Sequence, residues 1–192
     1  MTDGGMVNLA RIYYPVTVLG PGKRVGIWLA GCDRNCPGCI SPELKTSSSG
    51  TYVEVTEIMK NIQKLCSDAE GFTISGGEPF TSPEGLCALV REISKMSEDI
   101  IIFTGYRLSE LMEMRDDNVD YILDNISVLV DGPYIEALND GRGLRGSSNQ
   151  NIHVFKNAKR YVNLSDCERS LQVVVNNDRV MTIGMPVVNE DD

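Results

Sequence analysis

Histidine is almost absent from this chain of 192 residues, which contains only His153, and aromatic residues make up just 6% of it. A zinc site in this sequence can therefore draw on one imidazole at most. No apolar run approaches the 18 or more residues that a membrane-spanning helix requires. Dense basic runs are missing too, and a net charge of −9 argues against non-specific binding to nucleic acid. The first residues lack the basic start and apolar centre of a secretory signal, so we expect a cytoplasmic protein.

The six cysteines are unevenly placed, with three inside the stretch 32–39 and the other three scattered along the chain. A reducing cytosol argues against a disulfide framework. Two of the scattered ones, Cys66 and Cys87, fall in amphipathic stretches, where a cysteine is usually a small buried apolar residue. The clustered three are the ones that need a chemical explanation.

Short apolar segments rich in β-branched residues alternate with amphipathic ones, which predicts an α/β fold. We expect buried strands at 24–31, 72–77, 99–105, 126–132, 151–155 and 171–177. We expect helices at 55–69, 82–97 and 108–116, the second with Ser82 as N-cap and Pro83 at its first position. Crossovers of this length imply parallel strands. A partial or complete (β/α)6 barrel fits the length better than an eight-fold barrel, which typically needs about 250 residues.

The domain organisation is expected to be simple, with one domain over residues 1–192. Its core would span about 11–176, followed by a C-terminal extension at 177–192. In that region NNDRVMTIGMPVV (176–188) would form an added strand or hairpin, and the acidic end, 186–192, would fray. We expect a flexible loop at 45–52.

Polar or glycine-rich segments stand at the ends of the expected strands. GCDRNCPGC (31–39), GGEPF (76–80), TGY (104–106) and DGPY (131–134) each follow a strand, and LRGSSNQ (144–150) leads into the next one. Active sites of parallel α/β folds form at the carboxyl ends of the strands. We therefore expect these segments to meet at one site.

The cysteine spacing Cys-x3-Cys-x2-Cys, formed by Cys32, Cys36 and Cys39, indicates an iron–sulfur centre. Three thiolates can hold three corners of a [4Fe–4S] cluster and leave one iron open to a small molecule. The alternative is zinc, which normally needs four ligands and would have to recruit His153 or a distant cysteine. From spacing alone we favour the cluster.

The GGEP stretch adds a second feature. Gly76 and Gly77 let the backbone approach a ligand closely, and the carboxylate of Glu78 suits a ligand's ammonium group. The plainer alternative is a tight strand-to-helix turn with a solvated glutamate. Asp131 is likewise either a ligand contact or a turn residue, and the sequence does not separate the two.

At this point the sequence resembles a known family. Cys-x3-Cys-x2-Cys followed by GGEP resembles the pattern of the radical S-adenosylmethionine enzymes. More narrowly, YYPVTVLGPGKRVGIWLAGCDRNCPGC, SGGEPF, IFTGY, VLVDGPY and LRGSSNQ look like the activating proteins of anaerobic ribonucleotide reductases, a group related to the pyruvate formate-lyase activating enzymes. The resemblance covers residues 11–153 and implies a partial (β/α)6 barrel of the radical SAM type.

The resemblance also implies roles for individual residues. Cys32, Cys36 and Cys39 would ligate the [4Fe-4S] cluster, and its open iron would bind S-adenosyl-L-methionine. Around that cofactor, the family places contacts at Gly76, Gly77, Glu78, Pro79, Thr104, Gly105, Tyr106 and Arg145, and we add Asp131 to this set from its place after a strand. Gly76, Gly77 and Glu78 would bind its methionyl amine, with Pro79 shaping the turn, while Arg145 and SSNQ would lie near the cofactor or the partner's radical loop.

The implied reaction is reductive cleavage of S-adenosyl-L-methionine to methionine and a 5′-deoxyadenosyl radical, which takes a hydrogen atom from a glycine of the partner reductase. Reduced flavodoxin or ferredoxin would donate the electron. Many radical S-adenosylmethionine enzymes carry an aromatic residue just before the third cysteine, where this chain has Gly38; the reductase activators tend to have CPGC there.

Two alternatives stay open. One is a radical enzyme of the same architecture that acts on another glycyl radical enzyme or on a peptide. The other is a non-catalytic zinc-binding interaction module.

Overall fold

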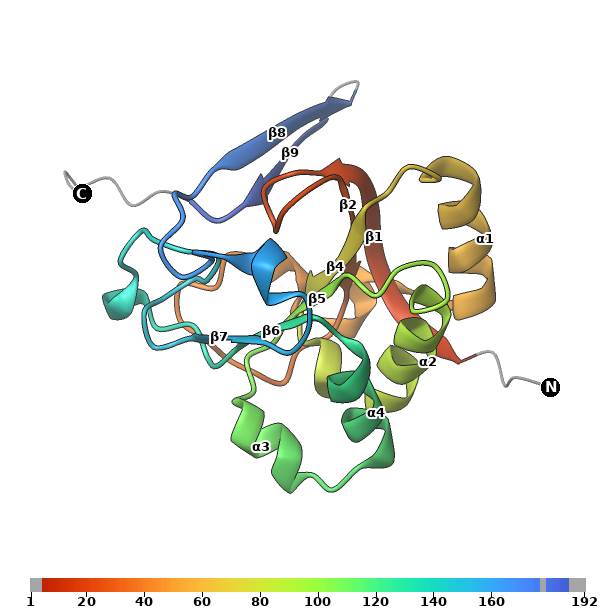
Figure 1. Cartoon of the computed structure of the whole chain (residues 1–192), viewed down its shortest axis with the longest axis horizontal. Helices are drawn as coiled ribbons and strands as arrows, with labels where there is room; N and C mark the ends of the chain where they lie inside the picture. The colour runs from red at the N-terminus through yellow and green to blue at the C-terminus, as the bar shows by residue number, and fades with distance from the viewer. Residues whose placement is uncertain (1–4, 177–178, 187–192) are drawn as a thin grey trace.

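The structure, a computed structural model, describes residues 5–176 and 179–186 and shows a mixed α/β fold (Figure 1). Its main sheet has seven strands in the order β3-β1-β2-β4-β5-β6-β7. The strands are β1 (Met6–Val16), β2 (Arg24–Leu29), β3 (Thr51–Glu54), β4 (Gly71–Gly76), β5 (Ile100–Phe103), β6 (Val128–Asp131) and β7 (Asn151–Val154). The four central strands, β2, β4, β5 and β6, are parallel, whereas β1, β3 and β7 add antiparallel.

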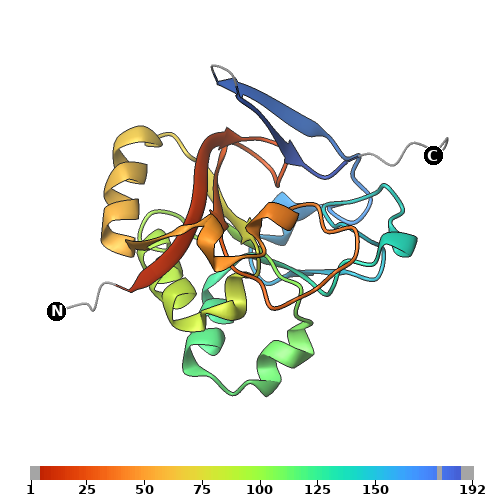
Figure 2. The ribbon, with the colours of Figure 1, turned by 180° about the vertical axis from the view of Figure 1, so that it is seen from behind.

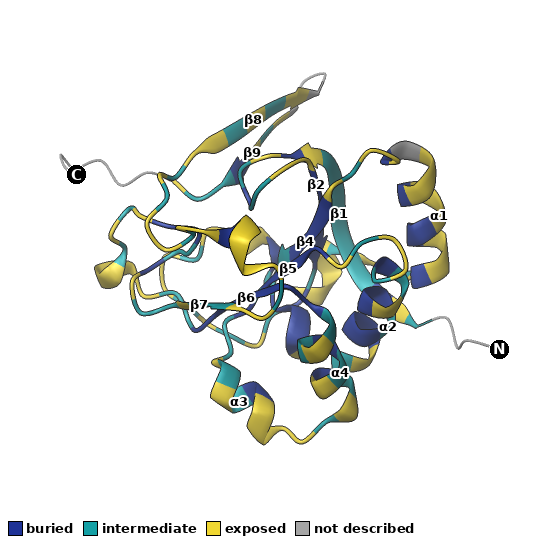
Figure 3. Cartoon of the chain, in the orientation of Figure 1, coloured by how far each residue is buried: buried dark blue, intermediate teal, exposed yellow. Residues whose placement is uncertain are grey.

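Four helices lie against one face of this sheet (Figures 1 and 2). They are α1 (Val55–Leu65), α2 (Pro83–Ile93), α3 (Leu108–Glu113) and α4 (Asp117–Asn125). Their apolar sides pack on alternate residues of the strands, such as Ile27, Ile74 and Ile102, and form the largest buried cluster. Burial follows the helical period, so each helix is buried toward the sheet and exposed on its outer side (Figure 3).

The opposite face is covered by loops and by a separate hairpin of β8 (Leu171–Asn176) and β9 (Arg179–Gly184). Ile183 of the hairpin packs with Trp28 and Leu44, while Leu144 and Tyr161 pack on Ile101 and its neighbours. Because both faces are covered, the central strands are buried along most of their length, and only the carboxyl ends of β4 and β5 are partly exposed.

Several expected elements are confirmed with small shifts in their ends, and two pairings are wrong. The predicted parallel strand at 151–155 is β7, which runs antiparallel to β6. Its connection from β6 holds a 3-10 turn at Glu136–Leu138 in place of the crossover helix that a parallel strand requires. The predicted strand at 171–177 is β8, which pairs with β9 outside the main sheet, so the expected hairpin at 176–188 begins earlier, at Leu171.

Other features were missed in the sequence. β1 and α4 were not expected, and the predicted loop at 45–52 instead holds a 3-10 turn at Ser47–Ser49 and the start of β3. Ser82 precedes α2, and Pro83 is its first residue as expected, but the Ser82 side chain makes no capping hydrogen bond in the described structure. The expected frayed tail lies almost wholly outside the described residues.

The amino ends of the central strands are joined by a buried ion pair. Arg24, at the start of β2, is fully buried, and its Nη2 lies 2.7 Å from Oδ1 of Asp99, just before β5. Arg24 also donates to Oγ1 of Thr73 in β4. Asp99 in turn pairs at 2.5 Å with Nε of Arg160, which lies within the 3-10 turn at Ala158–Tyr161. This network fixes the sheet at the end away from the loops described next.

Within the described residues, no helix combines the length and apolar character needed to cross a bilayer.

Candidate functional site

The carboxyl ends of β2, β4, β5 and β6 open into one cavity of about 240 Å³. The loops that follow these four strands supply most of its lining, as expected for parallel strands. The lining residues are Cys32, Arg34, Cys36, Gly38, Cys39, Ile40, Ser75, Gly77, Glu78, Phe103, Thr104, Gly105, Gly132, Tyr134, Asn139, Gly146, Gln150, Arg169, Met185 and Pro186. The predicted convergence of segments far apart in the sequence is therefore present.

The cysteine loop is held to the sheet by its first residues. The backbone N–H groups of Gly31 and Cys32 each donate 2.9 Å hydrogen bonds, to the carbonyls of Leu44 and Lys45. Gly38, with a φ of +68°, occupies the left-handed region that favours glycine, which explains why no aromatic residue stands before the third cysteine. Cys32, Cys36 and Cys39 are free thiols, partly exposed, and all three face the cavity.

The two glycines after β4 allow backbone to meet backbone. A Cβ on Gly76 would lie 2.1 Å from the carbonyl oxygen of Leu29, and one on Gly77 would lie 2.2 Å from that of Gly31. Instead, the N–H groups of Gly77 and Glu78 donate 2.8 Å hydrogen bonds to these same carbonyls. The glycines thus bring the GGE turn against the chain that enters the cysteine loop.

Glu78 is buried, with 3% of its surface exposed, and its carboxylate accepts three hydrogen bonds. Phe80 N–H donates to Oε1 at 3.0 Å, Thr104 Oγ1 to Oε1 at 2.7 Å, and Gly105 N–H to Oε2 at 2.6 Å. Burial nevertheless raises the pKa of Glu78 to about 7, because the hydrogen bonds offset only part of the cost of desolvating its charge. A cationic group entering the cavity would favour its ionised form.

A stacked arginine joins the cysteine loop to the loop after β5. The guanidinium carbon of Arg34 lies 3.7 Å from the ring centroid of Tyr106, and its Nη2 lies 3.3 Å from Glu110 Oε1. Tyr106 also donates its hydroxyl hydrogen to Asp33, beside the first cysteine. Tyr106 therefore lies behind the cavity wall as a support for the loop, while Arg34, which the sequence did not single out, lines the cavity.

Asp131 is buried and fully engaged with neighbouring groups. Its Oδ2 accepts from Leu108 N–H at 2.6 Å and lies 2.9 Å from His153 Nε2, while Oδ1 accepts from the backbone and side-chain amides of Asn151. Burial raises its pKa, but these hydrogen bonds outweigh that effect and lower the pKa overall. Asp131 and His153 thus connect β6, β7 and α3, and both lie outside the cavity lining.

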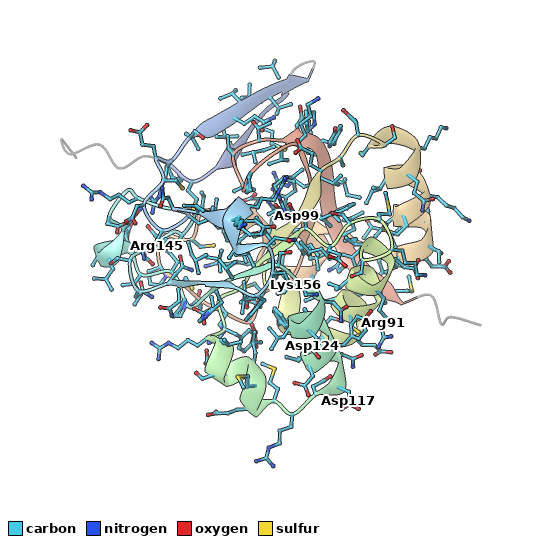
Figure 4. All side chains as sticks on the ribbon, viewed as in Figure 1. Arg91, Asp99, Asp117, Asp124, Arg145 and Lys156 are labelled. Atoms are coloured by element: carbon cyan, nitrogen blue, oxygen red, sulfur yellow. The ribbon has the colours of Figure 1, made fainter. Side chains whose placement is uncertain are left out.

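Arg145 lies in the loop that joins β6 and β7, on the side of the molecule opposite α1 (Figure 4). Its Nη2 pairs with Asp140 at 3.1 Å, and its side chain does not line the cavity in the described structure. Its neighbours Gly146 and Gln150 do line it, and Gln150 ties the loop together by accepting from the N–H groups of Gly146 and Ser147. The LRGSSNQ segment thus reaches the cavity through residues other than the predicted arginine.

The predicted site residues therefore divide into two groups. Those that line the cavity are Cys32, Cys36, Cys39, Gly77, Glu78, Thr104 and Gly105. Those that lie behind or beside the lining in the described structure are Gly76, Pro79, Tyr106, Asp131 and Arg145. The lining also includes Arg169, Met185 and Pro186, which sequence reasoning missed because they stand in no motif.

The donor set fits a multi-iron cluster. The metal-binding side chains that it offers to the cavity include three cysteine thiols, the ligand type that holds iron–sulfur clusters. In a [4Fe–4S] cluster each cysteine binds a different iron, so the thiolates surround a volume. Burial raises the pKa of the Cys32 thiol, and a metal bound there would deprotonate it outright. Three cysteines around one cavity meet this requirement.

Comparison with known proteins agrees with this fit. The family model described as "4Fe-4S single cluster domain" matches residues 18–153. The anaerobic ribonucleoside-triphosphate reductase-activating protein of Vibrio cholerae is 36% identical over 153 residues, which cover 74% of this chain and 96% of that protein. Its namesake in Escherichia coli (strain K12) is 32% identical, with 73% and 95% covered, and that of Enterobacteria phage T4 is 29% identical, with 76% and 93% covered. The chain therefore belongs to the family of anaerobic ribonucleoside-triphosphate reductase-activating proteins, which is built on a 4Fe-4S single cluster domain.

Proposed function

We propose that this chain is the enzyme that activates an anaerobic ribonucleoside-triphosphate reductase by generating a glycyl radical on it. The observation that carries the proposal is that Cys32, Cys36 and Cys39 line one cavity together with Glu78 and Gly105. The family's printed name supplies the partner. When bound, the reduced [4Fe-4S] cluster and S-adenosyl-L-methionine supply one electron and a cleavable C–S bond, and so a 5′-deoxyadenosyl radical.

The protein's own part is to bind and orient these groups. The three cysteines would hold the cluster, and the turn Gly76–Glu78, shaped by Pro79, would receive the methionyl ammonium group. Thr104 and Gly105 support this assignment because they hold both oxygens of the Glu78 carboxylate in a fixed direction. Exclusion of water around the bound cofactor would protect a radical from side reactions.

Outside the lining, we assign supporting roles. Tyr106 would hold the cysteine loop through Arg34, and Asp131 would hold the strand ends behind the cavity. Arg145, paired with Asp140, would face the partner protein's radical loop instead of the cofactor.

The finer fold assignment is a partial (β/α)6 barrel of the radical SAM type, in a single domain over residues 1–192. Four parallel strands with helices on one face and the cavity at their carboxyl ends support it. We further propose a cytoplasmic location and reduced flavodoxin or ferredoxin as the electron donor.

The proposal is tested by anaerobic reconstitution with iron and sulfide, followed by reduction and addition of S-adenosyl-L-methionine. We expect the electron paramagnetic resonance signal of a reduced cluster and formation of 5′-deoxyadenosine, and a glycyl radical when the reductase of the same organism is added. Cys36→Ala should abolish all three, whereas Cys66→Ala, at a buried cysteine away from the cavity, should retain them. A colourless protein that binds zinc and leaves the cofactor intact would overturn the proposal.

A further inference from the structure

Arg169 is a buried arginine beside the cavity that neither the motifs nor the family model explains. Its side chain is 2% exposed, and it stands outside the matched residues 18–153. Burying a guanidinium group is costly unless its hydrogen-bond donors are satisfied. The hydrogen-bond partners of Arg169 therefore indicate which parts of the structure this buried side chain holds together.

Those partners come from two chain segments. Nη1 donates to Asn139 Oδ1 at 2.7 Å and to the carbonyl of Pro186 at 3.2 Å. The remaining donors bind the loop between β6 and β7: Nη2 to the carbonyls of Arg142 (3.2 Å), Arg145 (2.6 Å) and Gly146 (3.1 Å), and Nε to that of Gly143 (3.4 Å). An ion pair with Asp140 Oδ1 at 3.7 Å offsets part of the charge, because Asp140 also pairs with Arg145.

Both segments form part of the cavity wall. Asn139 and Gly146 belong to the lining from one side, and Met185 and Pro186 from the other. Arg169 thus joins Pro186, which follows the β8–β9 hairpin, to the loop between β6 and β7, which belongs to the matched family domain. A lysine at this position could not make these contacts, because it lacks the planar fork of donors.

The residues that flank the β8–β9 hairpin on both sides line the cavity. Arg169 lies two residues before the start of β8, and Met185 immediately follows β9 (Figure 1). Gln172 fastens the first strand to the end of β1 by accepting from Thr17 N–H at 3.1 Å and donating to the Pro15 carbonyl at 2.8 Å. The ends of the hairpin are therefore held at the cavity while its body packs on the sheet.

We propose that Arg169, Met185 and Pro186 form a wall of the cavity that binds S-adenosyl-L-methionine, and that Arg169 is the positioning residue that holds this wall in place. The proposal rests on the proposed function, and it assigns residues beyond the matched family domain to the cofactor pocket. Met185 gives the wall an apolar surface, and it borders a neighbouring hollow together with Ile40 and Phe103. Such a surface suits an uncharged part of the cofactor.

The test compares three variants of the full chain, each carrying a reconstituted cluster. Arg169→Gln removes the guanidinium group that joins Pro186 to the loop between β6 and β7. Met185→Ala removes a lining side chain but leaves Arg169 intact. Arg160→Gln is the control, because Arg160 pairs with Glu70 and Asp99 at the other end of the sheet. The affinity for S-adenosyl-L-methionine is measured from its effect on the cluster's electron paramagnetic resonance signal. Hydrogen exchange of residues 171–176 and 179–186 is measured without the cofactor.

We expect Arg169→Gln to weaken cofactor binding at least about tenfold, a loss of about 1.4 kcal/mol, and to speed exchange in the hairpin at unchanged iron content. Met185→Ala should weaken binding about threefold or more without faster exchange, which is the size expected from a partly lost apolar contact. Arg160→Gln should lower thermal stability but leave the affinity unchanged.

Unchanged affinity in both Arg169→Gln and Met185→Ala would overturn the inference, and so would an equal loss in Arg160→Gln. These outcomes differ from failure of the proposed function, in which the wild-type protein itself would bind no S-adenosyl-L-methionine. If Arg169→Gln fails to fold, Met185→Ala alone decides whether the residues that follow β9 contribute to the cofactor pocket.

Discussion

At the scale of single residues, the glycines of the GGE turn have a measurable structural role. Gly76 has a φ of +128°, and its place against Leu29 leaves no room for a Cβ. Gly132 has a φ of +102°, but the nearest atom to an added Cβ is 3.7 Å away. We predict that Gly76→Ala lowers the free energy of unfolding by about 3 kcal/mol or more, and Gly132→Ala by about 1–2 kcal/mol. Denaturant unfolding measures both, and equal losses would show that the contact with Leu29 has no cost.

Asp131 provides a second residue-scale prediction, on pH. Its native pKa is lowered, so its stabilising effect is present above the unfolded pKa of about 3.9 and is lost as the pH falls through the lower native value. Asp131→Asn should cost about 2–3 kcal/mol at pH 7, because an amide cannot accept from all of Leu108, Asn151 and His153. Unfolding of the wild-type protein and of Asp131→Asn, measured from pH 7 to 3, should show the difference between their free energies of unfolding shrinking below about pH 4. A difference that stays constant with pH would contradict this account.

At the scale of elements, the two faces of the β8–β9 hairpin predict opposite responses. Ile183 is 3% exposed and packs with Trp28, whereas Val173 on the outer face is 61% exposed. Ile183→Ala should cost about 2–4 kcal/mol and speed hydrogen exchange in β9. Val173→Ala, an apolar truncation on the same hairpin, should change stability by less than about 0.5 kcal/mol. Equal effects of the two changes would mean that the hairpin is not fixed to the sheet by its inner face.

The elements also show what the sequence could predict. The runs that became β5 and β6 are almost continuously apolar, because strands buried on both faces need no alternation. β1 escaped prediction because its residues 8–14 are only half-buried, so polar and apolar side chains mix along it. α4 carries acidic residues on much of its surface, and its buried positions Val119 and Ile122 are too few to define a helical period. Its moderate content of apolar residues resembles that of a loop.

The candidate site was predictable where a chemical requirement sets the spacing, as it does for Cys32, Cys36 and Cys39. Arg169 was not predictable, because most of its partners are backbone carbonyl groups more than 20 residues away and one arginine in a polar stretch looks like any other. Asp131 shows the reverse case: its position suggested either a ligand contact or a turn residue, but its carboxylate is engaged by two backbone N–H groups and by the side chains of Asn151 and His153. Contacts between distant segments of backbone leave no local pattern.

At the scale of the whole molecule, the sheet separates stability from chemistry. The amino ends of its strands are joined by the buried network of Arg24 and Asp99, while the carboxyl ends carry the cysteines and Glu78. The two ends share the same strands, yet each has its own set of charged groups. Substitutions at the two ends should therefore have separable effects.

We predict that Asp99→Asn lowers the free energy of unfolding by about 3–5 kcal/mol, because it leaves Arg24 charged and buried without its partner. The folded fraction should still bind a cluster and cleave S-adenosyl-L-methionine at the wild-type rate per iron. Cys39→Ser should do the opposite: it should lose the cluster and the cleavage of S-adenosyl-L-methionine. Because the Cys39 side chain is partly exposed, this variant should unfold near the denaturant midpoint of wild-type protein without its cluster. Unfolding curves and 5′-deoxyadenosine assays on both variants measure this. If Asp99→Asn lost cleavage per iron as completely as Cys39→Ser, the two ends of the sheet would have to act as one unit, with the cavity's geometry set by the distant ion pair.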